Sequence, residues 1–289
     1  MEQIEQLDSL FPSPIDENDI LTSEILPEIK RCPEEVPPPY DLTVSDQGNT
    51  PKCVGHASAC LRQEKAFEQR VAKAFDGGWI YNRCKEIDGI PNVEGTFFRA
   101  GMKILQKQGA MPIDGGNPED YKIGSYAQVD DISFEGLKKS ISVYGSVLAG
   151  YKGSNPGWKE TIIRAPLSGE KIWGHAVCLI GYTKDYLIIQ NSWGEKKGTK
   201  GTFLAPKNYL PFEAWVCLSD LPIVETSLTG WIASKFVKNG IIINAVKLRE
   251  NYGLNGKLIK VLPIGTKITQ IGNTINQADG YDWIKIIIK

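Results

Sequence analysis

Two apolar runs separated by a short polar turn restrict the fold of this chain most strongly. The runs cover residues 175–182 and 186–191, with Thr183-Lys184-Asp185 between them. Two strand-like runs joined in this way predict an antiparallel β-hairpin. Pairing about a centre near Thr183 places His175 directly opposite Asn191, to within a residue or two. Because opposed side chains on antiparallel strands have Cβ atoms roughly 5 Å apart, we expect an imidazole to face a carboxamide.

His175 is one of only two histidines in the 289 residues, so its place in this hairpin is informative. Far upstream, the segment from Gln47 to Cys53 supplies a thiol. Cys53 begins a run that we expect to be helical, and the free N–H groups of a first helical turn favour a thiolate. A neighbouring imidazolium would favour the thiolate further. These residue types suit nucleophilic attack on an acyl carbon.

Each of these side chains has an expected role in such a reaction. His175 would pair with the thiolate of Cys53 and then protonate the leaving amine. Asn191 would accept the other ring N–H, and Trp193 would shield that hydrogen bond from water. The backbone N–H of Cys53 and the side-chain amide of Gln47 would donate to the oxyanion, where losing one donor typically costs about 10²–10³ in rate.

These segments resemble the papain-like (cathepsin-type) cysteine peptidases. Gln47 and Cys53 match the motif Gln-Gly-x-x-x-x-Cys, His175 lies in Gly-His-Ala-Val, and residues 191–194 read Asn-Ser-Trp-Gly. The resemblance covers residues 36–222 and implies an α+β, two-lobed papain-like fold. A helical lobe would carry the cysteine and a β-barrel-like lobe the histidine. A peptide or protein substrate would lie in the cleft between the lobes, with no cofactor or metal.

The resemblance also assigns two candidate substrate-binding residues. Gly95, in Glu-Gly-Thr, lies where the family has a glycine segment whose backbone pairs with the substrate, and Trp193 is the other candidate. Three departures change the expected shape of the cleft and leave the catalytic groups intact. Thr50 replaces the usual cysteine of a family disulfide, Val54 replaces an aromatic residue, and Lys197 replaces a second tryptophan. We expect the relatives of this chain to be bacterial members of the family that depart from the usual motifs in a similar way.

The net charge of −1 conceals an uneven distribution along the chain. Residues 1–40 carry ten acids and two bases, whereas residues 230–289 carry nine bases and three acids. The simplest interpretation is a solvated acidic tail and a basic small domain; mutual attraction is the alternative. Residues 1–35 form an acidic N-terminal arm and are a candidate pro-segment, although they are too short for the family's usual one. We hypothesise that the arm crosses the cleft or lies on the basic domain and holds the enzyme inactive.

Residues 223–289 resemble a small all-β bacterial SH3-like domain. Residues 244–249, 262–267 and 282–286 match its opening, middle and late blocks. Residues 230–237 look like its closing strand, so we expect a permuted closure; a truncated tandem repeat is the alternative. Such domains often bind peptidoglycan or peptides, which makes peptidoglycan or another anionic surface a candidate partner of residues 230–289. We expect no nucleic-acid partner.

The remaining sequence features bear on secondary structure and compartment. Helices are expected near residues 20–29, 96–108 and 134–143, and a strand at 146–151. No apolar stretch approaches the roughly 18 residues of a membrane span. The N-terminus encodes no signal peptide, which predicts a cytoplasmic protein as encoded and a secreted or cell-wall-associated one if the sequence is trimmed.

Other functions remain open at this point. A cell-wall peptide amidase or transpeptidase also joins a Cys/His site to an SH3-like domain, although such enzymes usually have a shorter separation than the 122 residues between Cys53 and His175. A catalytically silent peptide-binding scaffold is the third possibility. His56 lies one helical turn from Cys53 but has no orienting partner block, so we expect it to pack in the core. Cys60, Cys178 and Cys217 are expected to be buried.

Overall fold

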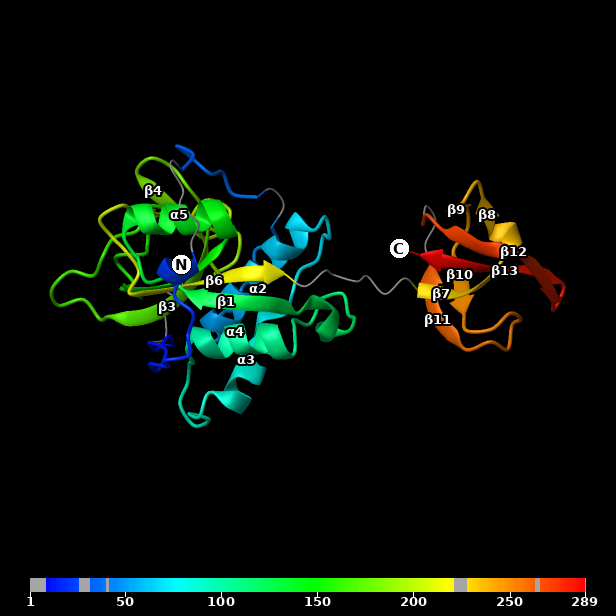
Figure 1. Ribbon diagram of the computed structural model, residues 1–289, viewed down its shortest axis with the longest axis horizontal. Coiled ribbons are helices and arrows are strands. Elements are labelled where there is room, and N and C mark those ends of the chain that lie inside the picture. Colours follow the sequence, from blue (N-terminus) through cyan, green and yellow to red (C-terminus); the bar gives the residue numbers. More distant parts are fainter. Residues whose placement is uncertain (1–8, 26–31, 40–41, 221–227, 263–265, 289) are drawn as a thin grey trace. The chain divides into compact units, whose positions relative to one another are not determined.

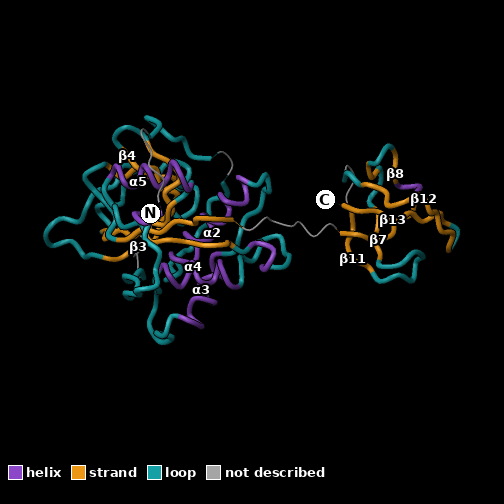
Figure 2. The backbone as a smooth tube through the Cα atoms, viewed as in Figure 1, coloured by secondary structure: helices purple, strands orange, loops and turns teal. Residues whose placement is uncertain are grey.

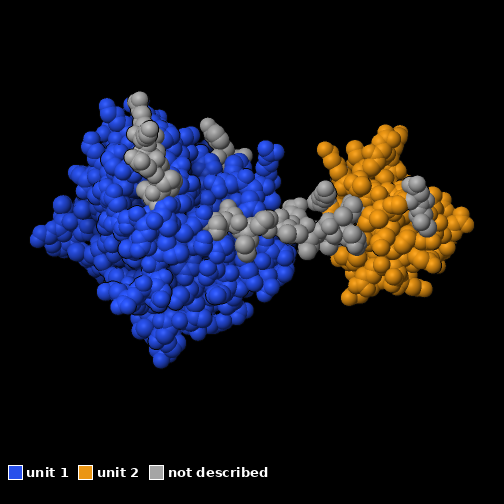
Figure 3. Space-filling view, in the orientation of Figure 1, with its two compact units in different colours: residues 1–223 blue, residues 224–289 orange. Residues whose placement is uncertain are grey.

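The computed structural model describes residues 9–25, 32–39, 42–220, 228–262 and 266–288 (Figure 1). The chain divides into two compact units, Met1–Ile223 and Val224–Lys289, which Figure 3 shows in separate colours. Each unit has a hydrophobic core of its own.

The described part of the first unit combines α-helices with one antiparallel sheet. The helices are α1 (Thr22–Ile25), α2 (Cys53–Glu68), α3 (Gly77–Ile87), α4 (Phe98–Lys107) and α5 (Phe134–Tyr144), with a short 3₁₀ helix η1 (Pro118–Tyr121). The strands are β1 (Ile123–Gln128), β2 (Val147–Gly153), β3 (Trp173–Tyr182), β4 (Tyr186–Gln190), β5 (Thr202–Pro206) and β6 (Glu213–Asp220). Their order in the sheet is β1-β6-β2-β3-β4-β5.

Helices cover both faces of this sheet, and Figures 1 and 2 show α5 on one side with α3 and α4 on the other. Side chains alternate between the two faces of a strand. Along β3, Ala176 and Cys178 therefore pack with the residues of α2, α3 and α4. Val177 and Leu179 pack in the other core, with α5. Because both faces are covered, every residue of β3 is buried, which explains its continuous apolar run.

Helix α2 begins at Cys53, as the sequence predicts, and most of its 16 residues are buried. Its first turn lies close to the start of α3. A Cβ atom added at Gly55 would lie 2.1 Å from the carbonyl oxygen of Gly77. Only glycine permits this approach, which fixes the N-terminus of α2. Among the described residues, no helix has the length and apolar character that crossing a membrane requires.

The hairpin of β3 and β4 forms, and its register lies two residues from the predicted central value, at the edge of the predicted range. Cys178 pairs with Gln190, and a bulge lies between Leu179 and Gly181. Continuing this register would set Asn191 opposite Val177 rather than opposite His175. The pairing next to the turn, Tyr182 with Leu187, sets this offset, and the bulge reduces it by one residue.

Other helices differ from the sequence prediction in number and extent. The helices expected at 96–108 and 134–143 are present as α4 and α5. The helix expected at 20–29 is only α1, four residues long, and residues 26–31 lie outside the described part. Sequence analysis missed α3, although Asp76 supplies a visible cap by accepting a hydrogen bond from the backbone N–H of Trp79.

The described part of the second unit is built from β-strands. They are β7 (Leu228–Ala233), β8 (Val237–Lys238), β9 (Ile241–Ile242), β10 (Val246–Arg249), β11 (Leu258–Leu262), β12 (Thr269–Ala278) and β13 (Tyr281–Ile288), with a 3₁₀ helix η2 (Ser234–Phe236). Five strands form a sheet in the order β11-β10-β7-β13-β12, and β8 pairs with β9. The core of this unit includes Ile232, Leu248 and Ile286.

Candidate active site

The thiol of Cys53 lies at the first residue of α2, against strand β3. The sulfur interacts with the backbone N–H of Ala176, the residue that follows His175. Both Cys53 and His175 are fully buried. Two residues 122 positions apart in the sequence are thus brought to one place, where α2 meets the sheet.

The imidazole of His175 is oriented by Asn191, at the end of β4. Its Nε2 lies 2.8 Å from Oδ1 of Asn191, which makes the ring N–H the donor. The same Oδ1 accepts the backbone N–H of Ser192 at 2.8 Å, so the carboxamide itself is held in place. The side chains meet as the sequence analysis expects, although the backbone register differs.

Three tryptophans enclose the imidazole. Trp193 stacks on it, with ring centroids 5.0 Å apart and an interplanar angle of 25°. Trp158 and Trp173 present edges to it at centroid distances of 5.7 and 5.8 Å. Sequence analysis named only Trp193. Trp173 was detectable, because residues two apart on a strand share a face; nothing in the sequence singles out Trp158.

Burial controls the protonation of His175. Exclusion of water penalises the imidazolium and lowers the pKa of His175 to about 4, although the hydrogen bond to Asn191 opposes the shift. Burial likewise raises the pKa of the Cys53 thiol, and the hydrogen bond between Ser9 and Cys53 offsets this only in part. Both shifts disfavour the expected thiolate–imidazolium pair as long as the site stays buried. The helix N-terminus does not compensate for the loss of solvent.

Gln47 is tied to the segment that carries Asn191. Its Oε1 accepts the hydroxyl of Ser192 at 2.6 Å, and its backbone N–H donates to the carbonyl of Ser192 at 2.8 Å. Its side-chain Nε2 donates to the carbonyl of Thr50 at 2.8 Å. One of the two amide protons of Gln47 is thus engaged.

The N-terminal arm covers the thiol. Oγ of Ser9 lies 3.2 Å from Sγ of Cys53. The backbone N–H groups of Ser9 and Leu10 each lie 3.3 Å from the carbonyl oxygen of Gly174. On the other side, the N–H of Thr96 donates to the carbonyl of Ser9 and the N–H of Phe11 donates to that of Thr96, both at 3.1 Å. Backbone hydrogen bonds on both sides therefore hold the arm in place.

Two glycines make room for the arm. Gly95 has φ of +90°, and a Cβ atom there would lie 2.4 Å from the carbonyl oxygen of Ser9. The candidate substrate-binding glycine therefore contacts the arm. Leu10 is fully buried, and a Cβ atom at Gly150 would lie 2.7 Å from Cδ2 of Leu10. Phe212 borders the same pocket. No sequence pattern marked Ser9 or Leu10.

Buried polar contacts anchor the rest of the arm. Arg99 of α4 forms an ion pair with Asp19, with Nε 2.9 Å from Oδ1, and also donates to the carbonyl of Pro14. The backbone N–H of Ser13 donates to Glu213 at 3.0 Å. Arg99 and Glu213 are 4% and 5% exposed. Because Asp19 is the ion-pair partner of Arg99, its loss would leave a buried charge uncompensated.

The remaining cysteines form no disulfide among the described residues. Cys60, Cys178 and Cys217 are buried, as expected. No group of three or more potential metal ligands occurs in the described ranges. The described histidines and acidic residues therefore offer no ready metal centre.

Sequence comparisons identify similar proteins. The sequence model of the family described as "Papain family cysteine protease" matches residues 76–210, which include His175 and Asn191 but not Cys53. The uncharacterized peptidase C1-like protein L477 of Acanthamoeba polyphaga mimivirus is 27% identical over 255 residues. That alignment covers 75% of this chain and 80% of the viral protein.

Solved structures support the architecture. Xylellain, a cysteine protease from Xylella fastidiosa, gives a TM-score of 0.68 at 22% identity, over 76% of this chain and 99% of that one. Procathepsin B S9 from Trypanosoma congolense gives a TM-score of 0.62 at 13% identity, over 76% and 88% of the two chains. At these identities the likeness establishes a papain-like α+β fold. The organisms are mixed, so a bacterial source for this chain stays a prediction.

Proposed function

We propose that the chain is a papain-family cysteine peptidase, an endopeptidase that works through Cys53, His175 and Asn191. The observation that carries this proposal is that the thiol, the imidazole and the carboxamide lie together at strand β3. The Cys53 thiol lies at the backbone N–H of Ala176, and the neighbouring His175 donates to Asn191. A nucleophile, a base and a group that orients the base are the three parts of such a site.

In the proposed reaction, His175 takes the thiol proton and the sulfur attacks the peptide carbonyl carbon. The C–N bond breaks, the leaving amine takes the proton from the imidazolium, and an acyl-enzyme thioester remains. Water then attacks the thioester, His175 accepts one of its protons, and that proton returns to the sulfur as the acid product leaves. We assign oxyanion stabilisation to the backbone N–H of Cys53 and the second amide proton of Gln47. Gly95 and Trp193 would border the bound substrate.

We further propose that residues 1–35 keep the peptidase inactive. Ser9 presents a hydroxyl to the sulfur rather than a carbonyl carbon, so the arm occupies the site without offering a bond to cleave. The burial it causes also disfavours the thiolate. Release of the arm would admit water and substrate and would let the Cys53–His175 ion pair form.

For residues 223–289 we propose an SH3-like module that brings the peptidase to its substrate. Strand β7, which contains most of the expected closing segment 230–237, pairs with the last strand β13, and this favours a permuted closure. The excess of basic residues in 230–289 suits peptidoglycan or another anionic surface as partner.

The test is intact-mass labelling with an epoxysuccinyl peptide inhibitor, on the full chain and on a chain lacking residues 1–35. We expect one adduct on the shortened chain, lost in Cys53→Ala and in His175→Gln. His56→Gln is the matched control, because it removes the only other histidine and should keep the adduct. A peptide library would then show internal cleavage. An adduct on another cysteine, or no adduct on the shortened chain, would favour the silent scaffold. Cleavage confined to cell-wall peptides would favour the amidase.

A further inference from the structure

The backbone of Thr96 pairs with the arm in the candidate active site. Its N–H donates to the carbonyl of Ser9 and its carbonyl accepts the N–H of Phe11, both at 3.1 Å, which makes a parallel β-bridge between Leu10 and Thr96. Ser9 is also the residue whose hydroxyl contacts the thiol of Cys53. The segment that lies against the nucleophile therefore takes its strand-type hydrogen bonds on this side from one residue, Thr96.

Helix α3 holds the residue before Thr96. The N–H of Gly95 donates to Oη of Tyr81 at 3.1 Å, and the carbonyl of Gly95 accepts Nζ of Lys85 at 2.9 Å. Tyr81 and Lys85 are four residues apart and therefore lie on one face of α3. Both backbone polar groups of Gly95 are thus bonded to α3, whereas those of Thr96 are bonded to the arm.

The ammonium of Lys85 is the centre of this support. It donates to Oδ2 of Asp88 at 2.7 Å and to the carbonyl oxygens of Ile90, Val93 and Gly95, each at 2.9 Å. An ammonium has three N–H groups, so four oxygens leave none of them free. The side chain of Lys85 is 17% exposed, and that of Asp88 is fully buried. One cation thus fixes the loop between α3 and the backbone that pairs with the arm.

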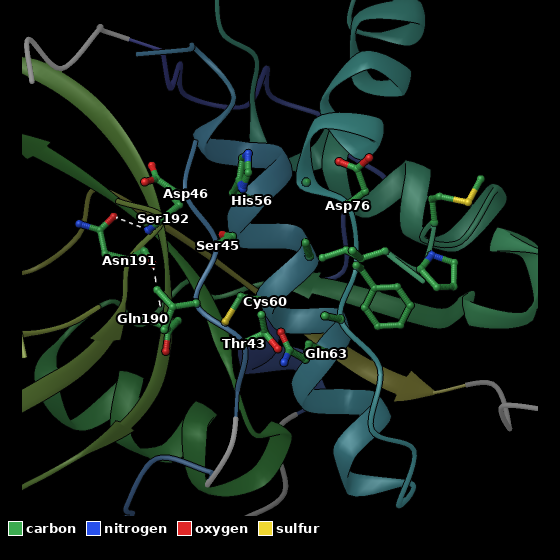
Figure 4. Close-up of a pocket in the computed structure, with 18 of the residues that line it drawn as sticks. Thr43, Ser45, Asp46, His56, Cys60, Gln63, Asp76, Gln190, Asn191 and Ser192 are labelled. Atoms are coloured by element: carbon green, nitrogen blue, oxygen red, sulfur yellow. Dashed lines mark hydrogen bonds between the residues drawn. The ribbon is translucent and has the colours of Figure 1, made fainter. Parts of the chain in front are cut away.

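Close contacts fix α3 against α2. A Cβ atom added at Gly77 would lie 2.6 Å from Cα of His56, whose position on α2 is drawn in Figure 4. A Cβ atom added at Gly55, two residues after Cys53, would lie 2.8 Å from Cβ of Tyr81. Helix α3 is therefore packed against the first turn of α2, and one helix supports both the nucleophile and the loop.

We propose that Lys85 is a positioning residue for peptide binding: through Gly95 it holds the backbone of Thr96, which pairs with the backbone of the substrate. For the substrate this inference rests on the proposed peptidase function, and for the arm it rests on the hydrogen bonds of Thr96 alone. Without the ammonium, the buried carboxylate of Asp88 loses its charge partner and three carbonyls lose their donor. The loop then no longer fixes Thr96, so a peptide binds less tightly while the chemistry at the sulfur is unchanged.

The test compares two reagents for the thiol of Cys53 on the full chain. An epoxysuccinyl peptide has a backbone that can pair with Thr96, whereas iodoacetamide has none. Both react only when the arm is released, so arm release cancels in the ratio of their rates, which is followed at Cys53 by mass spectrometry. We expect Lys85→Met to lower the ratio of peptide to iodoacetamide labelling at least tenfold. The limiting rate at saturating peptide should change less than twofold, because Lys85 takes no part in the attack by sulfur.

Two further variants control for charge and for folding. Arg83→Met removes another cation of α3, which pairs with Glu86 three residues on, but both of these side chains are exposed. The labelling ratio of Arg83→Met should therefore change less than twofold. Tyr81→Phe removes only the hydroxyl that accepts the N–H of Gly95. It should lower the ratio at least threefold, and it decides the matter if circular dichroism shows that Lys85→Met does not fold.

The outcomes separate this inference from the proposed function. An unchanged ratio in both Lys85→Met and Tyr81→Phe would overturn the role of Lys85, and so would a tenfold fall in the limiting rate. If iodoacetamide labels Cys53 and the peptide labels no variant, the proposed peptidase function fails instead. The arm then provides the test, because Lys85→Met weakens its pairing with Thr96 and should speed iodoacetamide labelling at least fivefold. An unchanged iodoacetamide rate would overturn the proposal for the arm as well.

Discussion

Leu10→Ala should loosen the arm and expose the thiol. Leu10 is fully buried in a pocket bordered by Gly150 and Phe212. Removing a leucine side chain from such a site forfeits about 2–3 kcal/mol. At about 1.4 kcal/mol for each tenfold change, the fraction of molecules with the arm released should rise about 30- to 150-fold.

The rate of Cys53 labelling by an epoxysuccinyl peptide measures that fraction. If the reagent reacts only with molecules whose arm is released, the pseudo-first-order rate should rise by the same factor. The rate of the chain lacking residues 1–35 is its upper limit. Leu167→Ala is the matched control, because Leu167 is 60% exposed and lies outside the arm. If Leu10→Ala leaves the labelling rate unchanged while the shortened chain reacts fast, the side chain of Leu10 does not supply the free energy that holds the arm in place. Equal rates for the full and shortened chains would refute inhibition by the arm.

Three further predictions concern the arm anchor, the orienting amide and pH. Asp19→Asn should raise the labelling rate at least tenfold because it leaves the buried Arg99 without its charge partner. Asp16→Asn, on a carboxylate that is 32% exposed and lies 4.0 Å from Nζ of Lys103, should change the labelling rate less than twofold. In the shortened chain, Asn191→Ala should lower kcat/KM about 10- to 150-fold, because a hydrogen bond to a group that becomes charged contributes about 1.5–3 kcal/mol; an unchanged kcat/KM would contradict the orienting role. Finally, His175 has a native pKa of about 4 against 6.5 when unfolded, so the unfolded state binds more protons between these values and stability falls as pH drops. Between pH 7 and pH 5, His175 should lower the free energy of unfolding in urea by about 2 kcal/mol. If His175→Gln loses as much stability as the unchanged chain over this pH range, His175 is not the cause.

Much of the candidate site was visible in the sequence because its parts lie in local patterns. Cys53 begins α2, and the apolar runs around His175 and Asn191 form a hairpin, as predicted. Each of these features follows from residue type and short-range periodicity. The bulge between Leu179 and Gly181 was not predictable in this way, because a bulge is set by how the strand packs rather than by its own alternation.

The arm shows the limit of local reasoning most clearly. Its acidic composition led to the hypothesis that it inhibits, but nothing in residues 9–11 marks Ser9 as the residue whose hydroxyl contacts the thiol. Helix α3 was missed as well, since its apolar pattern is weak and its position is fixed by the close approach of Gly55 and Gly77.

The sequence by itself determined which chemical groups are available: one thiol before a helix, one histidine beside an orienting amide, and two regions of opposite charge. Only the tertiary structure decided in which direction the two pKa values shift and what covers the pair. The physical reason is that a pKa depends on the solvent lost from every direction, whereas the sequence describes neighbours along the chain alone. Packing of the arm against Gly174 and Thr96 removes that solvent, and so it determines that the described state is the covered one.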